Sequence, residues 1–193
     1  MLVSLWAVAA RATVLVPLDT QALTARADRV VLGVVESQAA HWTGDHQAIY
    51  TDVTVRVTQS YKGAAAPGER VVVRREGGSL DGLGMRVFGA AQFTVGEEVV
   101  VFTEQRGGVA YTVGMTQGKL HVFEDGDGVK RVAADLGAVA FVSPQTGKVA
   151  GKIDANAKPV QSTATGTAAA GKSGPRRLED LEREIRGYVR SQK

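Results

Sequence analysis

The three histidines are the side chains of this sequence best suited to acid–base catalysis or metal binding. Four residues separate His41 from His46, with Asp45 beside the second, and His121 stands alone on a later apolar stretch. Zinc needs three or four such ligands on a rigid frame, and the sequence places no third ligand near the first pair. We therefore expect a solvated loop there, with a metal site as the alternative. His121 has no evident nucleophile partner, so we expect it on a strand surface.

A phosphate-binding pattern occurs near the end of the chain. Residues 166–173, from Gly166 to Ser173, read GTAAAGKS and fit the pattern G-x-x-x-x-G-K-[ST]. That loop binds phosphate when a buried strand precedes it and a helix begins at its lysine, because backbone amides then converge on the anion. Here a low-complexity run precedes the pattern, and Gly174 and Pro175 follow it. We expect a chance match, with no nucleotide site and no cofactor.

Two further patterns have simpler explanations. Residues 125–128, DGDG, resemble the start of a calcium loop, but the ligand series that such a loop requires is incomplete. A hairpin turn between two strands accounts for them better. Ser79 follows two glycines but lacks the G-x-S-x-G pattern of hydrolase nucleophiles. We predict no catalytic residue and no metal ligand in this chain.

The composition indicates one mainly β domain. The 193 residues are 44% hydrophobic and include 23 glycines, and valine runs occur at residues 71–73 and 99–101. β-Branched residues suit a pleated surface, and glycine suits turns and bulges. The absence of cysteine excludes disulfide bonds, cysteine-ligated zinc and thiol catalysis.

The charge distribution argues against a nucleic-acid partner. Lysine and arginine number 13 against 15 acidic residues in residues 1–147, and 10 against 5 in residues 148–193. The net charge of +3 therefore belongs to the C-terminal part and not to the body of the domain. Aromatic residues make up only 6% of the chain, too few for a platform on which bases stack.

The clearest strand signal lies at residues 49–63. Apolar and polar side chains alternate along it, which predicts a long strand that buries one face, and Ile49 and Val53 lie on that face. Residues 30–35, VVLGVV, are almost continuously apolar, so we expect a strand buried on both sides with a bend or bulge at Gly33. Residues 19–27 predict a short helix before it, and residues 37–47 a polar hairpin loop.

The remaining elements follow at short, even spacing. Strands are predicted at residues 70–75, 97–103, 109–113, 118–123 and 129–132, separated by glycine-rich turns. Regular short strands with turn signals favour a small antiparallel barrel or sandwich. A loop at residues 77–89 contains unusually many glycines.

The two ends of the chain differ from the body. Residues 1–12 are apolar with A-x-A patterns, which predicts the remnant of a signal peptide and therefore export to the periplasm or the cell exterior. Residues 13–142 are the predicted barrel domain, residues 143–174 a low-complexity linker, and residues 175–193 an amphipathic helix whose apolar stripe should dock on the barrel. No stretch approaches the ~20 apolar residues of a transmembrane helix.

The order of the segments ADRVVLGVVES, IYTDVTVRVTQSYKG, FTVGEEVVVFT and YTVGMTQGKLHV resembles that of a group of exported bacterial proteins of unknown activity. More distantly, residues 61–63 and 96–100 are similar to the netrin-like module of tissue inhibitors of metalloproteinases. This resemblance implies an OB-like barrel of five strands. The resemblance does not imply protease inhibition, because those inhibitors chelate the protease metal through an N-terminal cysteine and this chain has no cysteine.

We therefore expect an exported, monomeric, non-enzymatic module that binds a protein or a component of the cell envelope through loops at one end of the barrel. Two segments are candidates, the glycine-rich loop and the turn at residues 115–119. The candidate residues are Leu80, Leu83, Met85, Arg86, Phe88, Met115, Gln117 and Lys119.

Three alternatives remain open. The apolar side chains of the glycine-rich loop could simply plug the end of the barrel, since hydrophobic residues usually serve cores. A protease-inhibitor-like module could act through the same loop. A hydrolase could use His121, or a metal bound at His41 and His46.

Overall fold

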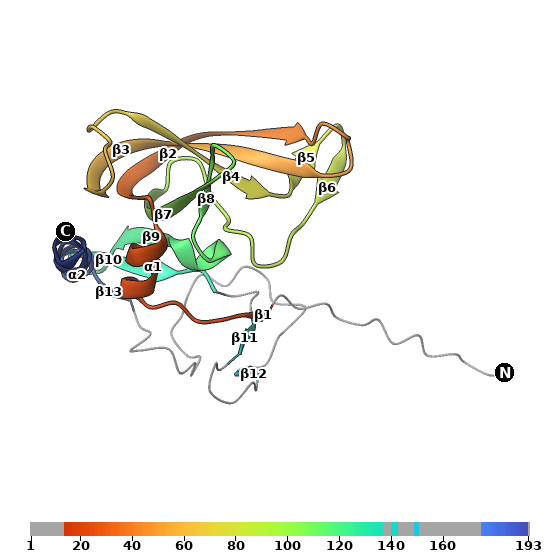
Figure 1. Cartoon of the computed structure of the whole chain (residues 1–193). Helices are drawn as coiled ribbons and strands as arrows, with labels where there is room; N and C mark the ends of the chain where they lie inside the picture. Colours follow the sequence, from red (N-terminus) through yellow and green to blue (C-terminus); the bar gives the residue numbers. More distant parts are fainter. Residues whose placement is uncertain (1–13, 137–139, 143–148, 151–174, 193) are drawn as a thin grey trace.

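The computed structural model describes residues 14–136, 140–142, 149–150 and 175–192. Strands dominate, with one short helix near the start and one helix at the end (Figure 1), so the expected mainly β class with these two helices is confirmed. The elements are β1 (Val14–Leu15), α1 (Thr20–Arg26), β2 (Arg29–Trp42), β3 (Ile49–Lys62), β4 (Arg70–Glu76), β5 (Gly78–Leu80), β6 (Leu83–Met85), β7 (Glu98–Arg106), β8 (Val109–Thr112), the single 3-10 turn η1 (Met115–Gly118), β9 (Lys119–Glu124), β10 (Lys130–Ala134), β11 (Ala140–Val142), β12 (Val149–Ala150), β13 (Arg176–Arg177) and α2 (Leu178–Ser191).

Five strands close into a ring. β7 pairs with β2, β2 with β3 and β3 with β4, all antiparallel, and β8 returns antiparallel to β7. β4 and β8 complete the ring in parallel through one pair of residues, Arg74 and Tyr111. β9, β10 and β13 extend the same sheet beyond β7. The ring is therefore continuous everywhere except at a narrow closure between β4 and β8.

β3 has the alternation that its sequence predicts. Ile49, Val53 and Val55 are buried, whereas Tyr50 and Asp52 lie on the opposite, partly exposed face. The strand pairs with β2 on one side and β4 on the other, so its side chains on the buried face line the interior of the ring.

β2 is longer than predicted. The predicted hairpin loop at residues 37–47 is wrong for its first six residues, which continue β2 and pair with the first half of β3. Their polar composition reflects an exposed outer face and not an absence of backbone pairing. The predicted irregularity at Gly33 is confirmed, because the pairing register with β3 shifts between Leu32 and Gly33. A Cβ atom at Gly33 would lie only 2.4 Å from the carbonyl oxygen of Arg56.

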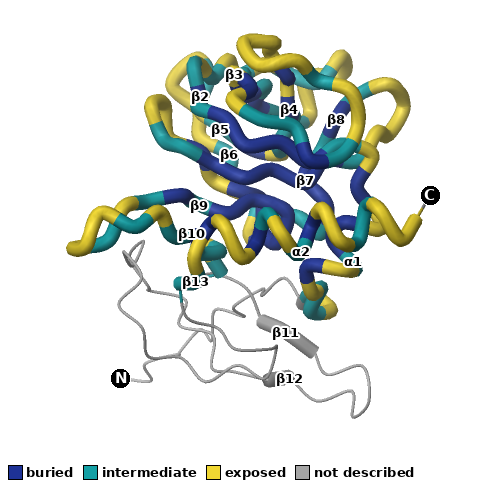
Figure 2. The backbone as a smooth tube through the Cα atoms, turned by 90° about the vertical axis from the view of Figure 1, so that its left-hand side faces the viewer, coloured by how far each residue is buried: buried dark blue, intermediate teal, exposed yellow. Residues whose placement is uncertain are grey.

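Two hydrophobic cores lie on opposite faces of β2 and β7. Val31 and Val99 face the ring interior, which is filled mainly by valines of β2, β3, β4 and β7 together with Ala91 and Phe93. Leu32 and Phe102 face the other way, toward α1 and α2. Figure 2 shows β7 as a largely buried strand. The near-continuous apolar sequence of β2 is thus explained by burial on both faces, as predicted.

The two helices cover the outer core. Asp19 caps α1 by accepting a hydrogen bond from the backbone N–H of Ala22 at 2.7 Å, and Leu23 is buried as predicted. Leu181 and Ile185 of α2 are fully buried in the same core. The apolar stripe of the C-terminal helix therefore docks on the outside of the sheet, beside α1.

Several predicted features lie outside the described residues. These are the apolar segment 1–12, the pattern at residues 166–173, and most of the linker 143–174, of which only Val149–Ala150 is described, as β12 paired with β11. Within the part of the chain that the structure describes, no helix is long and apolar enough to cross a membrane.

Candidate functional site

The glycine-rich loop contains a small β-hairpin. β5 pairs with β6, and the two residues between them, Asp81 and Gly82, both have positive φ angles, as a tight hairpin turn requires. Gly77 and Gly78 enter the hairpin where there is no room for a side chain. A Cβ atom would lie 2.6 Å from the carbonyl oxygen of Met85 at the first position and 2.4 Å from Thr51 Oγ1 at the second.

This hairpin is held against the neighbouring ends of β2 and β3. The backbone N–H of Gly77 donates to the carbonyl oxygen of Ile49 at 2.8 Å, and the Thr51 hydroxyl donates to the carbonyl oxygen of Gly77 at 2.7 Å. Trp42 Nε1 donates to Asp81 Oδ2 at 3.0 Å. The hairpin lies at the end of the ring farthest from α1 and α2 (Figure 1). These contacts make it a fixed projection of the barrel.

The apolar side chains of the hairpin and its exit face solvent. Leu83 is 59% exposed and Phe88 is 43% exposed, and Leu80 and Met85 are partly exposed. Arg86 is exposed, with its guanidinium 5.4 Å from the centroid of the Phe88 ring.

The ring interior is completed by residues that follow this stretch. Ala91 and Phe93 are buried in the valine core, and Gln38 Nε2 donates to the carbonyl oxygen of Phe93 at 2.9 Å. The plug interpretation therefore does not apply to Leu83 and Phe88, whose side chains are exposed.

The second predicted segment, the turn at residues 115–119, is mostly internal. Its backbone meets the end of the glycine-rich loop, because the N–H of Thr116 donates to the carbonyl oxygen of Gly89 at 2.9 Å. Met115 is partly exposed, whereas Gln117 is buried. Gln117 Oε1 accepts from the N–H of Leu18 at 2.8 Å, and its Nε2 donates to the carbonyl oxygen of Val16 at 3.1 Å. Gln117 thus holds residues 16–18 to the barrel.

Lys119 is also buried. Its Nζ lies 2.8 Å from Glu97 Oε2 and 5.5 Å from the centroid of the Phe93 ring. His121 Nδ1 lies 3.3 Å from the same Glu97 oxygen. Gln117 and Lys119 are therefore engaged with the chain's own groups. The structure brings the loop and the turn together, but only Met115 of the turn adds a partly exposed candidate side chain.

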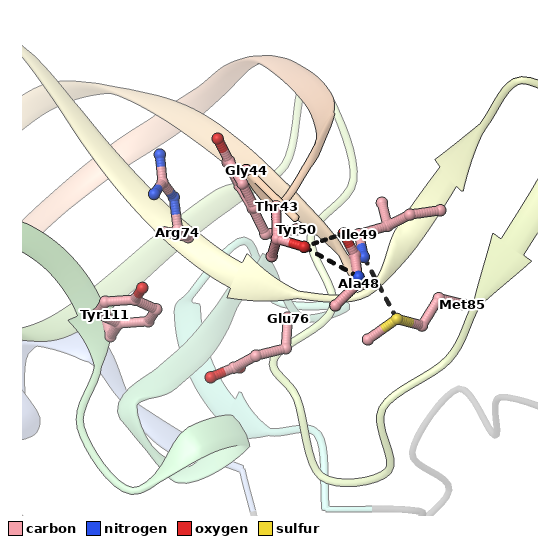
Figure 3. A pocket seen from close by; sticks show the side chains of 9 residues that line it. All are labelled: Thr43, Gly44, Ala48, Ile49, Tyr50, Arg74, Glu76, Met85 and Tyr111. Atoms are coloured by element: carbon pink, nitrogen blue, oxygen red, sulfur yellow. Dashed lines mark hydrogen bonds between the residues drawn. The ribbon is translucent and has the colours of Figure 1, made fainter. Parts of the chain in front are cut away.

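A pocket of about 380 Å³ lies beside the hairpin (Figure 3). The turn between β2 and β3 forms one wall, and Met85 extends from β6, where its sulfur accepts a hydrogen bond from the N–H of Ile49 at 3.3 Å. The other lining side chains come from β3, β4 and β8. They are Ile49, Tyr50, Arg74, Glu76 and Tyr111.

Arg74 is rigidly positioned at this pocket. Its Nε and Nη2 donate to the two carboxylate oxygens of Asp52 at 2.7 and 2.9 Å, and its guanidinium lies 3.8 Å from the centroid of the Tyr50 ring. His41 stacks on Tyr50 with ring centroids 5.3 Å apart. The hydrogen bonds to Asp52 raise the pKa of Arg74 above its ordinary value. Arg74 therefore stays protonated, its charge is paired with the Asp52 carboxylate, and its guanidinium is held against the Tyr50 ring.

Sequence reasoning missed this pocket. Tyr50 and Asp52 are two positions apart and share the outer face of β3, and Arg74 and Glu76 share a face of β4 in the same way. This spacing is visible in the sequence. What the sequence does not reveal is the register that places Asp52 opposite Arg74, or the bridge that brings Tyr111 to the same place.

The histidines are separated by the fold. His41 lies on β2 with Nε2 3.9 Å from Asp52 Oδ2, and His46 stacks on Trp42 in the following turn. His121 is on β9, part of the sheet extension beyond β7. Across residues 14–136 and the shorter described segments, histidine and acidic side chains form no group of three or more that could hold a metal ion.

No protein-family model matches this chain, and no curated protein matches it either.

Proposed function

We propose that the protein is an exported, non-enzymatic binding module that recognises a protein or cell-envelope component through hairpin β5–β6 and the segment that leaves it. The observation that carries the proposal is the exposure of Leu83 on a hairpin fixed by hydrogen bonds to the barrel, and of Phe88 on the segment that leaves this hairpin. Large apolar side chains that stay exposed to water on a rigid projection and on the segment leaving it favour a partner that buries them.

The strand order is compatible with a fold that binds partners through its connecting loops. The ring order β2-β3-β4-β8-β7, with a parallel closure between β4 and β8, is compatible with an OB-like barrel. In such folds the connecting loops carry recognition while the strands provide a rigid frame. The recognition residues we propose are Leu80, Leu83, Met85, Arg86 and Phe88, with Met115 beside them.

Export is proposed from residues 1–12, whose A-x-A patterns are typical of a signal-peptide cleavage site. Fusion of the first thirty or so residues to a reporter enzyme that is active only outside the cytoplasm tests it. Reporter activity supports export, and a silent but expressed fusion contradicts it.

The binding proposal is tested by affinity capture from envelope extract with the purified protein as bait. We expect Leu83→Ala combined with Phe88→Ala to abolish capture of the partners retained by the unsubstituted protein. Val95→Ala is the matched control, because Val95 is also a large exposed apolar residue but lies at the other end of the connection from β6 to β7, next to the start of β7. If the double variant retains every partner, or if Val95→Ala loses the same partners, this surface is not the binding site.

A further inference from the structure

The pocket beside hairpin β5–β6 has walls that suit an aromatic ring. Its surface includes the rings of Tyr50 and Tyr111 and the thioether of Met85. Aromatic rings pack favourably in offset or edge-on contact with other rings, and thioether sulfur makes favourable contacts with ring edges. A volume of about 380 Å³ lies at the lower end of the range for ligand pockets, which indicates one large side chain and not an extended ligand.

The charges at the pocket favour a neutral guest. Arg74 is already paired through two hydrogen bonds with Asp52, so an anionic guest would have to compete with a carboxylate that is held in place. Glu76, exposed at the rim, would also repel an anion. A cationic guest would be attracted by Glu76 at the rim but repelled by Arg74 in the wall, whereas a neutral ring can contact the tyrosine rings without meeting either effect.

The pocket is formed in advance of any ligand. Thr43 and Ala48 close the turn between β2 and β3 through a backbone hydrogen bond of 2.8 Å, and the Thr43 hydroxyl accepts from the N–H of Ala48 at 3.0 Å. Arg74 is fixed by Asp52 and Tyr50. Binding would therefore cost little side-chain conformational entropy at the pocket wall.

Pocket and hairpin form one continuous surface. Met85 lines the pocket and belongs to β6, the strand that also carries Leu83. A polypeptide that covers the hairpin would therefore pass the mouth of the pocket.

We propose that this pocket receives one uncharged aromatic side chain from the segment of a partner protein that lies on hairpin β5–β6. This inference rests on the proposed binding function and narrows the partner to a protein. The aromatic side chain acts as the anchor, and the exposed hairpin residues surround it and exclude water.

The probe for the test is N-acetyl-tryptophanamide, titrated into ¹⁵N-labelled full-length protein and followed by NMR. We expect saturable shifts of the backbone amide signals of Ile49, Tyr50 and Tyr111. N-acetyl-lysinamide and N-acetyl-leucinamide should bind at least about tenfold more weakly, because neither offers a ring. Equal binding of the lysine or leucine probe would overturn the aromatic assignment, and shifts confined to other regions would overturn the pocket assignment.

Two variants make the test specific. Ala48→Phe places a ring in the pocket wall and should weaken binding of the tryptophan probe by about tenfold or more, whereas Ala25→Phe on the exposed side of α1 should not. If Ala48→Phe disturbs the fold, Tyr111→Leu provides the second variant, since it removes a ring of the wall and should weaken the same probe. Unchanged binding in the folded variant contradicts the inference.

The two proposals can fail separately. If the pocket does not bind the probe but Leu83→Ala with Phe88→Ala still abolishes partner capture, the binding surface stands and only the aromatic anchor is wrong. If the probe binds but no partner depends on the hairpin, the hairpin surface is not the binding site and the anchoring role of the pocket is wrong with it.

Discussion

Tyr61 joins the barrel to the C-terminal helix through its hydroxyl group. The side chain is buried in the outer core, and its hydroxyl donates to Glu182 Oε1 at 2.8 Å. Burial, and then the hydrogen bond to the Glu182 carboxylate, raise the pKa of Tyr61 far above the ordinary value of 10.0. The folded protein therefore keeps the phenol protonated at a pH where the unfolded chain releases the proton.

This pKa shift predicts how Tyr61→Phe responds to pH. In the unsubstituted protein the contribution of the phenol to stability is fully present below about pH 10 and is lost as the pH rises further, because only the unfolded state then loses the proton. Tyr61→Phe should cost roughly 1 kcal/mol near neutral pH through loss of the hydrogen bond. Urea unfolding at about pH 8 and about pH 11 should show this difference shrinking at the higher pH.

Groups other than Tyr61 also titrate in alkali, but both proteins contain them, so their contributions cancel in the comparison. A difference between the two proteins that stays constant with pH would contradict the assigned pKa shift.

At the scale of elements, α2 is an integral part of the fold. Leu181 and Ile185 are fully buried between the sheet and α1, and Arg176, just before the helix, donates to the hydroxyl oxygen of Thr20 at 2.7 Å. Lys62 Nζ donates to Gln192 Oε1 at 3.2 Å at the other end of the helix. The helix is thus attached along its whole length.

Substitution of Leu181 by alanine should therefore destabilise the whole protein. We expect a loss of about 2–5 kcal/mol in the free energy of unfolding, since a fully buried leucine leaves a cavity behind. Arg183→Ala, on the exposed face of the same helix, should change it by less than about 0.5 kcal/mol. Chemical denaturation measures the free energy of unfolding of both variants. Similar values for the two variants would mean that the helix is not docked as described.

The hairpin β5–β6 depends on Gly78. Its φ of 154° lies in a region that side chains disfavour, and a Cβ atom would lie 2.4 Å from Thr51 Oγ1. Gly78→Ala should push the hairpin away from β3 and increase hydrogen exchange across residues 78–85. Gly84→Ala in the same hairpin is the matched control, because its Cβ atom would meet no atom closer than 3.7 Å. Equal exchange in the two variants would show that the close contact does not hold the hairpin.

Elements whose apolar residues recur at a regular spacing could be predicted from the sequence. The side-chain contacts between elements could not. The alternation in β3, the two-sided burial of β2 and the apolar stripe of α2 were each visible as periodic patterns. The extension of β2 to Trp42 was missed because residues 37–42, SQAAHW, do not alternate between apolar and polar side chains, although their pairing with β3 involves only the backbone. Gln117 and Lys119 looked like surface residues, but their polar ends are satisfied by Leu18 and Glu97, which are remote in sequence.

Across the whole molecule, β2 and β7 are the common wall of two cores. Every residue from Val99 to Phe102 is buried, alternately on the ring side and on the helix side. β8, by contrast, has four residues and meets β4 at a single pair. Opening of the molecule should therefore begin at the β4–β8 closure and reach β2 and β7 last.

Native-state hydrogen exchange measured by NMR tests this order. We expect the slowest exchange at the amides of Val31, Val100 and Val101, and faster exchange at Val109 and Ala110. The amides of β9, which pairs with β7 but lies outside the ring, serve as the reference. Exchange in β8 as slow as that in β7 would mean that the single bridge closes the ring as firmly as a full strand pairing.

The length of β3 also determines how far hairpin β5–β6 would lie from a surface on which the protein is immobilised. The first residue of β3, Ile49, lines the pocket, and its last, Lys62, contacts the end of α2. Fourteen residues of extended chain separate these points by roughly 40 Å. A protein immobilised through the end of α2 would therefore hold hairpin β5–β6 away from the support, which suits sensor surfaces and fusion partners better than attachment through the β2–β3 turn.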